Sequence, residues 1–137
     1  MKHRLYIAFL GLAVLVPAVS VFAHHAPSAI FDMKKVVTVT GTLTKVEWVN
    51  PHIQMYMDVK GQDGTVANWK LESNPPRWFT KVGVSRADFA AGIGKTVTID
   101  MVAALDGSKY GYLHKITFPD GTTFSLNDSE TKDKINP

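Results

Sequence analysis

The chain has 137 residues, of which 45% are hydrophobic and 20% charged, with 15 basic and 12 acidic side chains and no cysteine. The lack of cysteine excludes disulfide bonds, thiolate zinc sites, covalent haem attachment and a cysteine nucleophile. The length fits one domain, and a net charge of only +3 gives no indication of a nucleic-acid partner.

The first 23 residues have the pattern of a secretory signal peptide. Residues 2–4 are basic, residues 5–16 are almost continuously apolar, and Val21-Phe22-Ala23 fits the small-x-small rule of a cleavage site. A cut after Ser20 is the rival cleavage site. An uncleaved membrane anchor is the alternative, although a bilayer-spanning helix needs about 20 apolar residues. We therefore expect a periplasmic or secreted protein, with no stable membrane span after the leader is removed.

Cleavage after Ala23 leaves residues 24–137 as a single domain with five main strands. Strand patterns span residues 36–49, 53–59, 65–72, 96–102 and 110–118, and a short last strand is expected at 122–126. A change of apolar parity near Thr44–Lys45 predicts a β-bulge in the first strand. Pro76 and Ser85 are placed to open short helical segments between the third and fourth strands.

Three strands, a short helical connection and two further strands are the order of an OB-type barrel. We therefore predict an all-β fold, a small five-stranded OB-like barrel with a short helical segment. A small open sandwich is the alternative, because strand propensity does not prove closure. The polar residues from about 127 onward are expected to fray. Strand parity predicts that the core includes Val39, Ile53, Met57, Trp69, Leu71, Val97, Ile99 and Ile116.

Several stretches of the mature chain together resemble one bacterial exported family. His24-His25 and Phe31-Asp32 are followed by Val-Thr-Val-Thr-Gly-Thr-Leu-Thr-Lys-Val-Glu-Trp at residues 37–48 and by Asn50-Pro51-His52, and Phe118-Pro119-Asp120-Gly121 comes later. The chain is similar here to the family catalogued as domain of unknown function 6152. The resemblance covers nearly the whole mature chain. It supports export and the fold, and it implies no activity.

The two histidines that follow the leader are candidate metal ligands. If cleavage follows Ala23, His24 becomes the amino terminus, where its amine and imidazole can chelate one metal ion. The amine has a pKa of about 7.7–8.0, so a metal can displace its proton near neutral pH. Nitrogen donors favour Cu(II), followed by Ni(II) or Zn(II). His25 or His52 would add a third nitrogen; the alternative is that the two histidines are simply tolerated there, because short His tracts are weak signals.

His52 follows the Asn50-Pro51 corner, and strand parity places it on the polar face with Tyr56. The alternative role of His52 is turn chemistry, in which it caps backbone groups. Asn50 and Tyr56 are candidates for a face that contacts a ligand or partner. Met55 and Met57 could suit Cu(I), but they share the opposite face and are expected to fill the core.

The sequence contains no Ser-His-Asp order, glycine-rich phosphate loop or His-Glu-x-x-His motif. We therefore expect an exported binding protein rather than an enzyme, with copper or another divalent metal bound at the mature amino-terminal histidine. The alternative is a module without a metal, which contacts an unknown envelope protein through the barrel face.

Overall fold

The computed structural model describes residues 27–126, so the predicted leader, His24, His25 and the tail from residue 127 lie outside the described residues. A 3-10 turn, η2 (Pro27–Ala29), precedes the long strand β1 (Phe31–Glu47), which is followed by β2 (Gln54–Lys60) and β3 (Val66–Glu72). Two short helices, α2 (Pro76–Lys81) and α3 (Arg86–Ala90), then lead to β4 (Thr96–Ala104), β5 (Tyr110–Thr117) and β6 (Thr123–Ser125).

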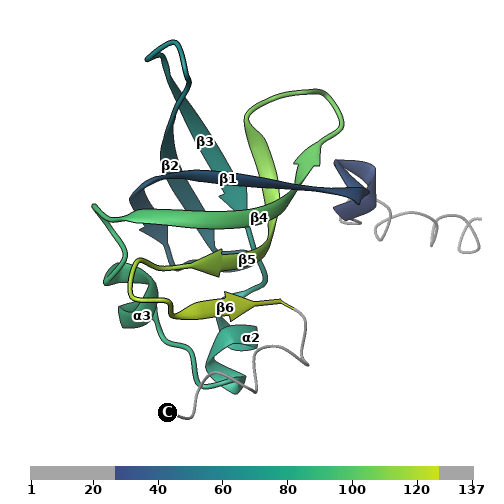
Figure 1. The fold of residues 1–137 in the computed structure, drawn as a ribbon. Coiled ribbons are helices and arrows are strands. Elements are labelled where there is room, and N and C mark those ends of the chain that lie inside the picture. Colours follow the sequence, from purple (N-terminus) through teal and green to yellow (C-terminus); the bar gives the residue numbers. More distant parts are fainter. Residues whose placement is uncertain (1–26, 127–137) are drawn as a thin grey trace, which may run out of the picture.

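Five of the strands close into a barrel (Figure 1). The hydrogen-bonded order is β3-β2-β1-β4-β5, with antiparallel neighbours, and β3 also pairs with β5 in parallel. This last pairing joins the two ends of the row, while β6 adds to β5 outside the ring. With its helices between β3 and β4, the arrangement is that of an OB-like barrel. The predicted fold class is confirmed, and the open sandwich is excluded.

Strand β1 reaches two neighbours because it bends. Residues 42–47 pair with β2, and Phe31 and residues 36–42 pair with β4. The register to β2 shifts between Leu43 and Lys45, which confirms the bulge predicted there. At Gly41 a Cβ atom would lie 2.4 Å from the backbone oxygen of Asp58, so this close crossing of strands requires glycine.

Strand β1 also begins earlier than the sequence pattern predicted. Phe31 pairs with Ala104, and the next pair is Val36 with Val102. The residues between Phe31 and Val36 are not in register with β4, and their apolar pattern gave no strand signal. The strand is therefore extended by tertiary pairing rather than by local propensity.

Most of the residues that strand alternation predicted to face inward are buried in the core. Ile53, Met57, Leu71, Val97, Ile99 and Ile116 are fully buried. Val39 and Trp69, also predicted in the core, are only partly buried and pack against its edge. Trp69 lies on the turn side of the residues of β3 that pair with β5, which begin at Lys70.

The two helices lie at one end of the barrel (Figure 1), and each contributes a phenylalanine to the core, Phe79 from α2 and Phe89 from α3. The rings of Phe79 and Phe89 meet edge to face, with centroids 5.2 Å apart, and Trp48 packs against both. Ser85 begins α3 as predicted, because its backbone N and hydroxyl both donate to the Asp88 carboxylate.

In the part of the chain that the structure describes, no helix is long and apolar enough to span a membrane.

Replacing Leu71 with alanine should destabilise the fold by about 2–5 kcal/mol, the usual cost of truncating a fully buried leucine. Val66→Ala, on the same strand but well exposed, is the matched control and should change stability by less than about 0.5 kcal/mol. Urea unfolding of both variants measures the difference, and equal midpoints would show that the inward face of β3 is misassigned.

Candidate functional site

The backbone of Ile53 positions the neighbouring His52 next to the end of β3. Ile53 is fully buried and fixes the end of the β1–β2 loop in the core. Its N–H donates to the backbone oxygen of Asn74 (3.4 Å), and its oxygen accepts from the N–H of Ser73 (3.0 Å). These bonds tie the loop to the end of β3. His52 therefore stands beside Glu72, the last residue of β3.

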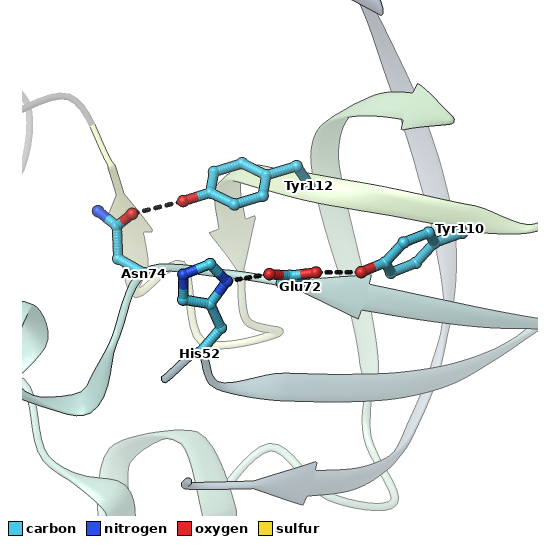
Figure 2. Close-up of polar contacts among 5 residues, drawn as sticks. All are labelled: His52, Glu72, Asn74, Tyr110 and Tyr112. Atoms are coloured by element: carbon cyan, nitrogen blue, oxygen red, sulfur yellow. Dashed lines mark hydrogen bonds and ion pairs between the residues drawn. The ribbon is translucent and has the colours of Figure 1, made fainter. Parts of the chain in front are cut away.

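Glu72 joins His52 to Tyr110 (Figure 2). One carboxylate oxygen of Glu72 bonds Nδ1 of His52, and the other accepts a hydrogen bond from the Tyr110 hydroxyl. The His52 and Glu72 side chains are only 29% and 19% exposed, so the network is partly shielded from water. Charge-assisted hydrogen bonds in such surroundings are stronger than neutral ones in water.

Tyr112 and Phe31 extend the same cluster. The Tyr112 hydroxyl donates to Oδ1 of Asn74 at 2.6 Å, beside the Glu72 network (Figure 2). The Phe31 ring packs against the rings of Tyr110 and Tyr112, with centroid distances of 5.0 and 5.6 Å. The beginning of β1 is thus fixed directly behind the two tyrosines, and their hydroxyls are directed to the end of β3.

The bond to Glu72 determines which nitrogen of His52 can bind a ligand. An ionised carboxylate only accepts hydrogen bonds, so Nδ1 of His52 is the donor. In the neutral ring Nε2 then carries the lone pair. Metal-binding histidines commonly have this arrangement, in which a carboxylate on one nitrogen orients the ring and makes the other nitrogen more basic. His52 is therefore suited to act as a ligand through Nε2, with Glu72 as its positioning group.

Tyr56, the predicted face residue, lies next to this cluster. Its hydroxyl donates to Glu47 (3.0 Å) and to Gln54 (3.2 Å), and Gln54 pairs across the strands with Glu72. The Lys45 ammonium lies 5.2 Å from the centre of the Tyr56 ring. The hydrogen bond from Lys45 and then that from Tyr56 lower the pKa of Glu47. The Tyr56 hydroxyl therefore already has hydrogen-bond partners within the protein.

Asn50, the other predicted face residue, is exposed in the β1–β2 loop. Asn50 precedes His52 by two residues in the same loop, and of the two face residues only Tyr56 is linked to the His52 cluster, through Gln54 and its pairing with Glu72. Met55 and Met57 are fully buried, as expected of core residues. His24 and His25 lie outside the described residues.

The described domain alone does not contain a complete metal site. Between residues 27 and 126, no group of three or more His, Cys, Asp or Glu side chains is arranged to hold a metal ion. His52 and Glu72 supply two such side chains, and Glu72 is already engaged by His52 and Tyr110.

Comparison of the sequence with known protein families identifies the family of this chain. The profile of the family of unknown function DUF6152 matches residues 13–113. The chain belongs to this family. DUF6152 membership confirms the resemblance carried by the 37–48 stretch and by Asn50-Pro51-His52. No curated protein is significantly similar to the chain. No solved structure is significantly similar to it either.

Five members of the cluster were not predicted as site residues from the sequence: Phe31, Glu72, Asn74, Tyr110 and Tyr112. The phenols come from β5, 38 residues after Glu72 at the end of β3 and Asn74 just beyond it, and no local pattern links the two segments. The available signal was weak: the Tyr-x-Tyr spacing of Tyr110 and Tyr112 puts both rings on one face of a strand.

All three tyrosines of residues 27–126 should ionise above the ordinary tyrosine pKa of about 10. Burial raises the pKa of Tyr56, Tyr110 and Tyr112, and the Glu72 carboxylate raises it further for the last two. Because the folded state holds these protons more tightly, their contribution to stability is complete below about pH 10 and is lost as pH rises above it. Ultraviolet titration of the mature protein, with the urea-unfolded chain as control, tests this. A tyrosine that titrates near pH 10 in the folded protein would contradict it.

Proposed function

We propose that this protein is an exported metal-binding protein, in which His52 provides the ligand from the folded barrel and the amino terminus provides the rest. The supporting observation is the Nδ1 bond from His52 to Glu72, which leaves Nε2 as the metal-binding nitrogen. The amine and imidazole of His24 would supply two further nitrogens, with His25 as an alternative third donor. Such a nitrogen-rich set favours Cu(II).

The proposed site requires the amino terminus to reach His52. His24 lies three residues before the 3-10 turn Pro27–Ala29, in which the N–H of Ile30 donates to the oxygen of Pro27. Three extended residues would span about 10 Å. From Phe31 to His52 there are three successive side-chain contacts, through Tyr110 and Glu72. Pro27–Ala29 forms a short 3-10 turn just before β1, so the chain upstream starts from a defined point close to the cluster.

Chelation by one residue makes the terminus an efficient donor. An amine and an imidazole on His24 close a ring around the metal without ordering a second residue. The third nitrogen, from His52, is already oriented by Glu72, and ligands that are preorganised in this way lose little conformational freedom on binding. The site would therefore depend on correct removal of the leader.

Export should be accompanied by cleavage between Ala23 and His24. The basic start, apolar run and small residues of the leader motivate this cut. Expression with the native leader, followed by amino-terminal sequencing and intact mass measurement, identifies the first residue. A protein that begins with any residue other than His24 would contradict both the cut and the chelating terminus.

The mature protein should bind one Cu(II), and His52→Ala should weaken binding by about tenfold or more, as expected for the loss of a coordinating nitrogen or its orientation. His114→Ala is the matched control, since His114 is also partly buried on the barrel and lies outside the cluster. Calorimetric titration measures both affinities. Binding should also weaken in acid, because protons compete for the same nitrogens.

Two further variants separate the roles of the ligands. A chain that retains Met before His24 should bind copper much more weakly, because the amine no longer belongs to the histidine residue. Glu72→Gln should weaken binding less than His52→Ala, because it removes only the carboxylate that orients the ring. If the mature chain binds copper no better than the Met-extended one, the terminal site is refuted and the partner-binding module becomes the preferred function.

A further inference from the structure

The first half of β1 is an open edge of the sheet. Residues 36–42 pair with β4 on one side, whereas β2 pairs with the other side only from Thr42 onward. No other strand of the described domain pairs with that side, and the β2–β3 hairpin extends away from it (Figure 1). In an antiparallel ladder alternate residues direct their N–H and C=O groups to the partner strand, so the residues between them direct theirs to the opposite side. Residues 36–40, which we call the β1 edge, therefore present backbone groups that no strand of this domain pairs.

The side chains of the β1 edge are suited to contact with another strand. The edge reads Val-Val-Thr-Val-Thr, so all five residues are β-branched and none is charged. Val37 and Val39 pack against the core but are only partly buried. Thr38 and Thr40 are exposed and bond to side chains of β4. An added strand would cover the exposed parts of the two valines and continue the sheet beside the threonines.

The other open edges of the sheet are short or protected. Strand β6 pairs only with β5 and has three residues. In β3 the residues before Lys70 lie beyond the pairing with β5, but the Lys109 ammonium lies 5.2 Å from the centre of the Trp69 ring. Lysines beside an edge are a common protection against further pairing, and the β1 edge has none within it. It is therefore the edge on which an extended chain adds most readily.

We propose that the β1 edge pairs with the β1 edge of a second copy of this chain, antiparallel and about a two-fold axis. If all five residues are used, Thr38 lies opposite the partner's Thr38, and Val37 lies opposite the partner's Val39. Valine thus meets valine on the inner face and threonine meets threonine on the outer face, and both kinds of cross-strand pair stabilise antiparallel sheets. A two-fold pairing of one surface with itself is also the commonest form of oligomer.

The charges next to the β1 edge favour a second copy over an unrelated strand. Lys34 precedes the edge and is exposed. In the register centred on Thr38 it lies opposite the partner's Thr42, and Thr42 pairs with Asp58 within its own chain. One oxygen of the Asp58 carboxylate accepts the Asn68 amide at 2.5 Å, and the other has no hydrogen-bond partner in the described domain. Lys34 of each copy is therefore placed to form an ion pair with the partner's Asp58, twice in each dimer.

The dimer should be weak, because the interface is small. A pairing of five residues from each chain buries less than the roughly 1,200 Å² of a standard stable interface. The dimer should therefore form reversibly as the protein concentration rises. Salt should weaken it further, because exposed ion pairs are screened. The inference goes beyond the proposed metal site and does not depend on it, since neither the β1 edge nor Asp58 belongs to the His52 cluster.

The test is sedimentation-velocity ultracentrifugation of the metal-free mature protein over a range of concentrations, in which we expect a monomer–dimer equilibrium. Thr38→Lys should raise the dissociation constant of the dimer by about tenfold, because it places two lysines directly opposite each other. Thr96→Lys is the matched control, since Thr96 is also exposed but lies on β4, which has β1 on one side and β5 on the other. It should dimerise like the unaltered protein, and urea unfolding checks that both variants remain folded.

An exchange of charges tests the identity of the partner and the register together. Lys34→Glu should weaken the dimer, because it brings two carboxylates together, and the double variant Lys34→Glu/Asp58→Lys should restore it. The proposal is overturned if the unaltered protein is monomeric at every concentration, if Thr38→Lys dimerises equally well, or if the exchange does not restore the dimer. A protein that stays monomeric but binds an extended peptide would assign the β1 edge to a different partner and would equally overturn it.

Discussion

The parallel pairing of β3 with β5 is the constraint on which the rest of the structure depends. It consists of three register pairs: Lys70–Tyr110, Leu71–Gly111 and Glu72–Tyr112. A Cβ atom on Gly111 would lie 2.3 Å from the Met101 sulfur and 3.3 Å from a Leu71 methyl carbon, so only glycine lets the two strands close over the core. The same closure buries Leu71 and brings Glu72 beside the tyrosines of β5. The pairing of β3 with β5 therefore both closes the barrel and assembles the candidate site.

This origin explains what the sequence could and could not predict. Local patterns were sufficient for the strands, the bulge near Thr44 and the inward faces, because alternation and turn residues act over a few positions. They were also sufficient to put His52 and Tyr56 on one face. They could not place Tyr110 on Glu72, because that contact spans 38 residues and arises only when the barrel closes. Phe31 was missed for a related reason, since its pairing with Ala104 lies beyond an irregular stretch without strand periodicity.

Burial gives the Glu72 carboxylate its structural role. A partly buried carboxylate loses hydration, and this loss is tolerable only if hydrogen bonds replace the water. His52 and Tyr110 provide one bond to each oxygen, and Tyr110 is itself held by the ring of Phe31. The imidazole is therefore restrained from two directions, by the buried Ile53 beside it in the chain and by a carboxylate that has little freedom to move. A ligand that meets Nε2 finds a ring that is already oriented.

Phe31 links this restrained ring to the amino terminus. Its side chain packs on the two tyrosines, while the carbonyl of the preceding Ile30 accepts the N–H of Leu105. The start of β1 is therefore held from two sides, by the tyrosine rings that contact Phe31 and by the β4–β5 loop that bonds Ile30. The contacts from Phe31 to Tyr110, from Tyr110 to Glu72 and from Glu72 to His52 thus connect the start of β1 to the imidazole.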